Sequence, residues 1–383
     1  MAIIEMSKER LPQFDGLRGL AILLVLIHHY KISISGIEPG SLLAYLLVPT
    51  RLAWSGVDLF FVLSGFLITG ILLDSRKMSS FFWPFYRRRA VRILPLYFLC
   101  FGLFEMALIL PLPLPSAFDD PLPALSYATF TQNILMAYNN SFGAQWMGPT
   151  WSLAVEEQFY LLFPLLIRYC APRILAVIFA AIVALAAIFR ALAPGDIFSY
   201  VLTPCRADAL MLGALCALLL RDAATRSFVA QNRAITYAAL AVLCGGAGVL
   251  LVQSTKLGGM PSLGYSWLTL LYACLLIIAA TETRGPIASI TRWAPLRSLG
   301  TISYGVYLVH AGSLALCHFY LLGHRTPIIT GAADAAVTLL SGAITIGIAA
   351  MSWRFFEEPL LRVTSTERLM EAPQTALSFR GRC

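Results

Sequence analysis

The chain has 383 residues, of which 58% are hydrophobic and 13% are charged, and its mean hydropathy is +0.76. A soluble domain of this size does not hide so much apolar surface in one core, so the composition excludes a water-soluble protein and indicates a polytopic protein of the lipid bilayer. The net charge of +8 does not indicate a nucleic-acid partner, because the basic residues are scattered between apolar runs without a nucleic-acid-reading module.

Ten apolar runs have the lengths of membrane-spanning helices, since crossing about 30 Å of hydrocarbon takes about 17 to 25 residues. In chain order they lie at residues 17–37, 56–73, 93–111, 150–168, 174–193, 206–220, 234–253, 265–281, 299–320 and 331–353. The sequence therefore predicts an all-α membrane domain over residues 1–362, with about ten transmembrane helices. Residues 363–383 are polar and predict a disordered cytoplasmic tail.

Most of the 28 Lys and Arg residues fall on one side of these runs when the N-terminus is placed in the cytoplasm. Cytoplasmic loops of membrane proteins carry an excess of Lys and Arg. The charge distribution therefore predicts that both termini are cytoplasmic. The longest connection on the other side, residues 111–149, begins with several prolines and predicts a partly ordered lid over the outer mouth of the helix bundle.

The first apolar run carries two groups that do not belong in hydrocarbon, the guanidinium of Arg18 and the imidazole of His29. Eleven steps of an α-helix return almost to the starting direction, so both side chains are predicted to lie on one face, about 16 Å apart along the axis. With Arg18 at the inner surface, His29 lies near the middle of the bilayer. An ionisable group at that depth is costly and is a functional candidate by default.

Further polar residues fall at different depths in the predicted spans. His310 lies near the middle of the ninth run, and Asp58 lies near the outer end of the second. Glu156 and Glu157 lie in the outer third to middle of the fourth run, where Ser152 shares a helix face with Glu156. Polar residues inside a helix bundle normally line a cavity or a pathway, so this series predicts a route across the membrane.

The residue types in this series narrow the chemistry. An imidazole such as that of His29 is the usual side chain for taking a proton from a hydroxyl at neutral pH. The arginines at 87–92 lie at the inner surface and are suited to hold phosphates, so they predict a phosphate-bearing cytosolic donor. No Walker-type loop, dinucleotide fingerprint or C-x-x-C pair occurs, so ATP hydrolysis, hydride transfer and a metal site are not predicted.

Six motifs follow one another along nearly the whole chain. They are DGLR followed by ten residues and then His29 (15–29), GVDLFFVLSGFL (56–67), FYRRRAVRILP (85–95), WSLAVEEQFY (151–160), SYGVYLVH (303–310) and FEEP (356–359). In this order they resemble the acyltransferase 3 family of integral membrane O-acyltransferases.

The resemblance implies a multi-pass enzyme of the cytoplasmic (inner) membrane. Such an enzyme takes an acyl group, commonly acetyl from acetyl-CoA as co-substrate, and places it on a hydroxyl, usually of a carbohydrate outside the membrane. His29 matches the essential histidine of the family and Arg18 matches its partner. Arg89 and Arg92 match the arginines that the family assigns to the donor.

The chemistry of these residue types and the family resemblance lead to one mechanistic hypothesis. Arg89 and Arg92 hold the phosphates of acyl-CoA, and His29 deprotonates the acceptor hydroxyl that attacks the acyl carbon. The acceptor approaches from outside past Asp58 and Glu156, and Glu156 is placed with His29 and Arg18 in the catalytic group. A variant in which His29 itself carries the acyl group is also chemically allowed. The residues predicted to support this centre are Ser152, Glu157, Tyr304 and His310.

Several of these residues also have structural interpretations. His29 is alternatively a packed histidine bonded to a neighbouring helix, and His310 with Tyr304 is alternatively part of a hydrogen-bond set that joins membrane helices. Arg89 and Arg92 are also explained by the excess of basic residues in cytoplasmic loops or by anionic lipid head groups.

The carboxylates have such alternatives as well. Glu156 and Glu157 are alternatively partners of an interior base such as Arg190 or Arg206, and Asp58 is alternatively bonded to helix ends across the bundle. For the whole chain, the rival function is a transporter that uses the buried polar series as a proton or substrate pathway. The absence of an internal repeat and the inward cluster of arginines favour the acyltransferase.

Overall fold

The computed structural model describes residues 12–34, 41–253 and 262–363. Within these ranges the chain forms helices, turns and loops, and extended segments meet in an isolated bridge between Ile34 and Ile329. The predicted all-α fold is therefore confirmed. Residues 364–383 of the predicted tail lie outside the described residues, and the prediction that both termini are cytoplasmic stays a prediction.

Ten helices in the described ranges have 17 or more residues, and they correspond one by one to the ten predicted runs. They are α1 (Pro12–Ile32), α3 (Gly56–Ser75), α4 (Phe82–Ile109), α7 (Trp151–Tyr169), α8 (Pro172–Ala191), α10 (Thr203–Leu219), α12 (Arg233–Gln253), α13 (Ser262–Thr281), α16 (Ser303–Leu322) and α17 (Ala332–Ser352).

Eight segments of the described chain are long and apolar enough to cross a membrane, which confirms the prediction of a polytopic membrane protein. Helices α1 and α7 are not among the eight, although their lengths of 21 and 19 residues match the other long helices. Both helices carry the polar residues of the candidate site, including His29 in α1 and Glu156 in α7, and these lower the hydropathy.

Short helices connect the long ones. They are α2 (Leu42–Leu47), η1 (Val48–Ser55), η2 (Ser116–Phe118), α5 (Ala124–Ala128), α6 (Gln132–Asn139), η3 (Gly148–Thr150), α9 (Asp196–Val201), α11 (Ala223–Gln231), α14 (Pro286–Thr291), α15 (Ala294–Thr301) and the π-helical turn η4 (Trp353–Glu357). The proline-rich connection 111–149 contains η2, α5 and α6, so this predicted lid is an ordered segment.

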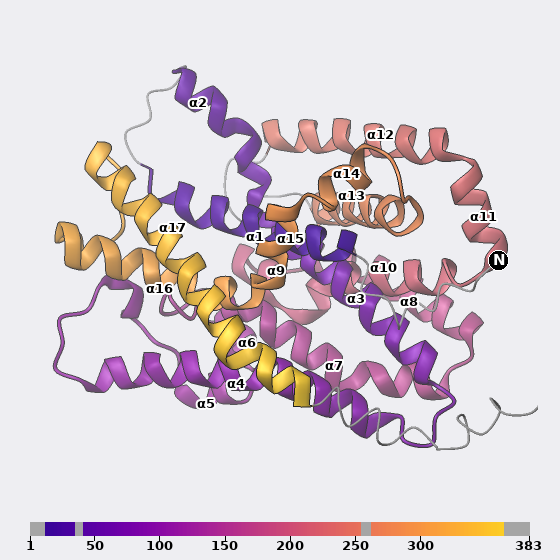
Figure 1. The fold of residues 1–383 in the computed structure, drawn as a ribbon, viewed down its shortest axis with the longest axis horizontal. Helices are drawn as coiled ribbons and strands as arrows, with labels where there is room; N and C mark the ends of the chain where they lie inside the picture. The colour runs from indigo at the N-terminus through magenta and orange to yellow at the C-terminus, as the bar shows by residue number, and fades with distance from the viewer. Residues whose placement is uncertain (1–11, 35–40, 254–261, 364–383) are drawn as a thin grey trace, which may run out of the picture.

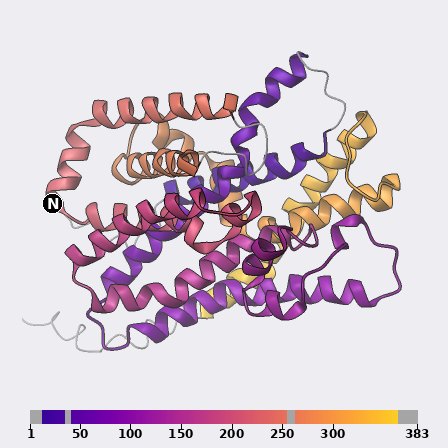
Figure 2. The ribbon, with the colours of Figure 1, turned by 180° about the vertical axis from the view of Figure 1, so that it is seen from behind.

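Helix α3 lies at the centre of the bundle and contacts α1, α7, α10 and α13. Glycine permits its closest approach, to α10: a Cβ at Gly65 would collide with the backbone carbonyl of Leu210, and a Cβ at Gly213 would collide with that of Val62. Small residues at such crossings let helix backbones pack tightly in membranes. Helices α12 and α4 lie at opposite margins of the bundle in both views (Figures 1 and 2), so α3 and α1 are enclosed between them.

Candidate active site

One cavity in the bundle collects the predicted arginines. Its volume is about 230 Å³, and it lies between helices α1, α3, α4, α7 and α16. We call it the arginine cavity, and the polar side chains that line it are Arg18, Ser64, Arg89, Arg92, Ser152, Glu156, Tyr160, Ser303, Tyr304 and Tyr307. Six residues that the sequence placed in the candidate site, from four different helices, therefore meet at one cavity: Arg18, Arg89, Arg92, Ser152, Glu156 and Tyr304.

The position of Arg89 is fixed by helix α7. Its guanidinium carbon lies 5.9 Å from the centre of the Tyr160 ring, a distance at which a cation is attracted to an aromatic face. The hydroxyl of Tyr160 is hydrogen-bonded to Ser64 of α3 at 2.6 Å. Tyr160 follows Glu156 by one helical turn, so a carboxylate and a guanidinium share this wall of the cavity.

Arg18 lies on helix α1 at the same cavity. Its guanidinium donates a hydrogen bond of 2.9 Å to Asp15, one turn earlier, and its side chain is 25% exposed. The cavity therefore holds three guanidinium groups, from Arg18, Arg89 and Arg92, against the carboxylate of Glu156. Guanidinium groups gathered at a cavity suit an anionic ligand.

A second cavity, of about 330 Å³, contains the predicted histidine. We call it the histidine cavity, and its aromatic and polar lining includes His28, His29, Ser33, Trp54, Phe142, Gln145, Trp151, Tyr200, Tyr307 and Thr326. Phe142 and Gln145 come from the connection 111–149, which therefore forms part of the wall of this cavity.

The ring of His29 has a defined hydrogen-bond pattern. Its Nδ1 lies 2.9 Å from the carbonyl oxygen of Val25, and a carbonyl only accepts, so Nδ1 carries the hydrogen. The Nε2 of the neutral ring then holds a lone pair, which is the form that a general base requires. His29 is half-buried and lines the histidine cavity, so a ligand in that cavity can approach the ring.

His310 packs directly behind this base. The centres of the His29 and His310 rings lie 4.6 Å apart, and the rings meet edge to face. The Nδ1 of His310 donates to the carbonyl of Tyr307 at 2.7 Å, and its Nε2 has no hydrogen-bond partner among the described residues. His28 packs against His29 from the other side, with ring centres 5.0 Å apart.

The sequence predicted one continuous route from Arg18 to His29. The structure instead contains two separate cavities, one at each of these residues. Arg18 lines the arginine cavity, whereas His29 lines the histidine cavity. The two cavities share two lining residues, Val57 and Tyr307. A helical period places two residues on one face, but residues of other helices decide whether the space along that face is continuous.

Asp58 lies in the first turn of α3, near the end of the predicted run, and is paired with a buried base. Asp58 is 1% exposed and forms an ion pair with Arg206, and in the described structure it lines neither cavity. A carboxylate in a membrane interior is stabilised by a paired base, which explains why these two groups meet. Arg190 pairs with Asp208 at 2.8 Å, so the interior bases considered for Glu156 and Glu157 have other partners.

Glu157, which is half-buried, and His310, which is buried, were predicted to support the site and lie next to residues of the cavities. Neither lines the arginine or the histidine cavity, within the part of the chain that the structure describes. One carboxylate oxygen of Glu157 is buried without a hydrogen-bond partner among the described residues. Of the described His, Cys, Asp and Glu side chains, no three are grouped so that they could hold a metal ion.

The residues of the cavities that were not among the predicted site residues include Ser64, Tyr160 and Tyr307. All three lie inside the motifs that carry the family resemblance. Tyr160 follows Glu156 by four residues and Tyr307 follows Tyr304 by three, so helical spacing from predicted residues places them on the same faces. This spacing was the signal that could have identified them.

Comparisons with known proteins identify the family of the chain. The family model described as "Acyltransferase domain" matches residues 11–354. Relatives include the O-acetyltransferase OatA of Staphylococcus aureus (strain NCTC 8325 / PS 47), 26% identical over 92% of this chain and 58% of the relative. The putative peptidoglycan O-acetyltransferase YrhL of Bacillus subtilis (strain 168) is 30% identical over 91% of this chain and 55% of the relative.

A further relative is the peptidoglycan O-acetyltransferase OatA of Listeria monocytogenes serovar 1/2a, 28% identical over 92% of this chain and 56% of the relative. The chain thus spans little more than half the length of the relatives that it matches. No solved structure matches it. Because the family model covers nearly the whole membrane domain, the chain belongs to the acyltransferase 3 family, as its motifs predict.

Proposed function

We propose that this protein is an O-acetyltransferase of the cytoplasmic membrane that moves an acetyl group from acetyl-CoA to a hydroxyl of a carbohydrate outside the cell membrane. The observation that carries the proposal is the arrangement of the two cavities. One gathers three guanidinium groups and the other contains a histidine with a lone pair on Nε2, and they meet at Val57 and Tyr307. Membership of an acyltransferase family favours this function over a transporter.

The arginine cavity is the site proposed for the donor. Guanidinium groups bind phosphates through paired, charge-assisted hydrogen bonds, and CoA carries several phosphates. Arg89 and Arg92 follow the basic run at 87–88, which the positive-inside rule places at the cytoplasmic surface, where acetyl-CoA is available. The thioester end of the donor then points into the bundle, toward Val57 and Tyr307.

His29 is the proposed general base. Its Nε2 takes the proton of the acceptor hydroxyl while the hydroxyl oxygen attacks the acyl carbon. The carbon–sulfur bond then breaks, and the CoA thiolate leaves with the proton that His29 returns. The variant in which Nε2 itself accepts the acyl group uses the same lone pair and then passes the group to the hydroxyl.

The histidine cavity is the site proposed for the acceptor. Its wall contains Trp54, Trp151 and Tyr200, with the Trp151 and Tyr200 ring centres 4.9 Å apart. Flat aromatic faces suit the apolar face of a sugar ring, and Gln145 supplies hydrogen-bonding groups for its hydroxyls. Two of the relatives are described as peptidoglycan O-acetyltransferases, so a cell-wall glycan is the first acceptor to test.

The donor site can be tested with the purified full chain in detergent. We expect the wild-type protein to bind acetyl-CoA, and Arg89→Ala to weaken binding by about 10-fold or more, since a charged hydrogen-bond pair is worth about 1.5–3 kcal/mol. Arg233→Ala is the matched control, because Arg233 is 53% exposed and pairs with Glu282 away from both cavities. A wild-type protein that binds no acetyl-CoA would overturn the proposal.

The acceptor can be sought in the cells that carry the protein. We expect mass spectrometry of cell-surface glycans to show acetyl esters that disappear when the protein is deleted. They should return with the wild-type chain but not with Arg89→Ala. Glycans with the same ester content in the presence and absence of the protein would contradict a carbohydrate acceptor.

A further inference from the structure

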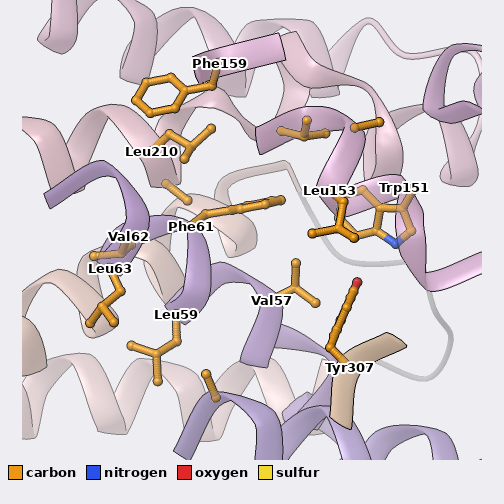
Figure 3. Packing of buried hydrophobic residues seen from close by; sticks show 14 of the residues in the cluster. Val57, Leu59, Phe61, Val62, Leu63, Trp151, Leu153, Phe159, Leu210 and Tyr307 are labelled. Atoms are coloured by element: carbon orange, nitrogen blue, oxygen red, sulfur yellow. The ribbon is translucent and has the colours of Figure 1, made fainter. Parts of the chain in front are cut away.

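Val57 of α3 and Tyr307 of α16 separate the two cavities. Both side chains line the arginine cavity and the histidine cavity, yet they are only 6% and 7% exposed. Figure 3 shows both side chains, with the hydroxyl of Tyr307 directed toward the start of helix α7, where Trp151 and Leu153 lie. The boundary between the cavities therefore includes one aliphatic side chain and one aromatic ring.

Hydrogen bonds hold the Tyr307 ring in this position. Its hydroxyl donates to the carbonyl oxygen of Pro149. The hydroxyl has a single hydrogen, so the 2.6 Å bond to Ser152 is one in which Ser152 donates and Tyr307 accepts. Ser152 lines the arginine cavity and Pro149 lines the histidine cavity, so this one hydroxyl ties together a wall of each.

Tyr307 is linked to the proposed base, His29, through His310. The backbone carbonyl of Tyr307 accepts the Nδ1 hydrogen of His310 at 2.7 Å, and the His310 ring packs against His29 with centres 4.6 Å apart. A movement of α16 at Tyr307 would therefore shift the His310 ring and change its contact with the ring of His29.

Both cavities reach the surface. Arg18, which lines the arginine cavity, has a side chain that is 25% exposed, and Thr326, which lines the histidine cavity, is exposed. An open passage between them would bring the thioester together with His29 and with water from the histidine cavity. Water would then replace the acceptor: the carbon–sulfur bond would break, acetate and CoA would form, and the proton of water would pass through His29 to the sulfur.

We infer that Tyr307, closed against Val57, is a gate that keeps the donor thioester from water until an acceptor is bound. The inference rests on the proposed function, because it takes the arginine cavity as the donor site and His29 as the base. In the closed position the thioester and His29 lie on opposite sides of the Tyr307 ring. Transfer requires the ring to move aside, and exclusion of water at that moment gives the acceptor hydroxyl its advantage over hydrolysis.

The test measures acetyl-CoA hydrolysis by the purified full chain in detergent, without any acceptor, from the release of the CoA thiol. Tyr307→Ala removes the ring, and we expect hydrolysis to rise about 10-fold or more over wild type. Tyr320→Ala is the matched control, because Tyr320 lies on the same helix, is 57% exposed and bonds to Pro113 outside both cavities. The control is expected to hydrolyse acetyl-CoA at the wild-type rate.

Two further variants change the side chains between the two cavities but keep an aromatic ring at position 307. Tyr307→Phe keeps the ring but loses the bonds to Ser152 and Pro149, and it should raise hydrolysis less than Tyr307→Ala. Val57→Phe adds bulk at the boundary of the two cavities, and it should lower the rate of acetyl transfer measured at saturating acetyl-CoA.

The outcomes separate the gate from the proposed function. A Tyr307→Ala protein that binds acetyl-CoA like wild type and hydrolyses it no faster overturns the gate. If that variant does not fold, unchanged transfer by Val57→Phe overturns it. A wild-type protein that neither binds nor turns over acetyl-CoA overturns the proposed function, and the gate with it.

Discussion

The imidazole of His310 meets the imidazole of His29 edge to face, with ring centres 4.6 Å apart, although the two residues belong to the first and ninth of the long helices. Each ring also donates its Nδ1 hydrogen to a backbone carbonyl of its own helix, at Val25 and at Tyr307. The proposed base is therefore held by a local hydrogen bond and by a ring from a distant helix. Its orientation depends on the packing of α1 against α16.

Loss of the base should abolish transfer without loss of donor binding. We expect His29→Ala to lower acetyl transfer by about 10²–10⁴-fold, the range typical of a general base. The arginine cavity does not include His29, so acetyl-CoA should bind as in wild type. His324→Ala, which lies outside both cavities, is the control. Full transfer activity in a folded His29→Ala protein would exclude both forms of the mechanism.

Loss of His310 should act on the base and not on the donor. His310→Ala removes the ring that packs against His29, so we expect the turnover rate to fall about 10-fold or more while the KM for acetyl-CoA stays near wild type. The measurement is steady-state kinetics at varied acetyl-CoA. A rise in KM with an unchanged turnover rate would contradict this role.

The ion pair between Arg206 and Asp58 should be important for stability. Both groups are 1% exposed, and the Arg206 guanidinium also lies over the rings of Trp151, Tyr200 and Tyr265. Arg206→Met leaves a buried carboxylate unpaired, which costs about 3–5 kcal/mol. We expect a clear fall in the thermal unfolding midpoint in detergent.

A double variant and a surface pair provide the controls for this experiment. Arg206→Met combined with Asp58→Asn should recover part of the lost stability, because no unpaired charge remains. Arg325→Ala breaks the ion pair between Arg325 and Asp119, whose side chains are 69% and 48% exposed, and should cost only about 0–1 kcal/mol. Equal losses for Arg206→Met and Arg325→Ala would show that burial of the pair is unimportant.

The contact between α3 and α10 should not tolerate a methyl group. A Cβ at Gly65 would collide with the Leu210 carbonyl, so we expect Gly65→Ala to destabilise the fold by about 1–3 kcal/mol. At Gly102 of α4 nothing lies within 4 Å of the added carbon, so Gly102→Ala should be neutral or gain up to about 1 kcal/mol from helix propensity. Thermal unfolding of both variants, side by side, checks the difference, and a loss at Gly102 as large as that at Gly65 would contradict it.

The sequence by itself determined the class of the protein and its chemical groups. Apolar runs of membrane-spanning length predicted ten long helices, and all ten are present in the described residues. This prediction is confirmed because hydropathy is a local property, which neighbouring residues along the chain determine. The roles of His29, Arg18, Arg89, Arg92 and Glu156 stay predictions, although each of these residues lines one of the two cavities.

Tertiary structure alone decided how the polar groups are combined. Asp58 was expected at the mouth of the acceptor route, but the packing of α3 against α10 pairs it with Arg206. Arg18 and His29 were expected along one route, but the Tyr307 ring of α16 and Val57 divide it into two cavities. Such contacts join helices that are far apart in the chain, and their geometry depends on side-chain volumes at the crossings, which no period in the sequence records.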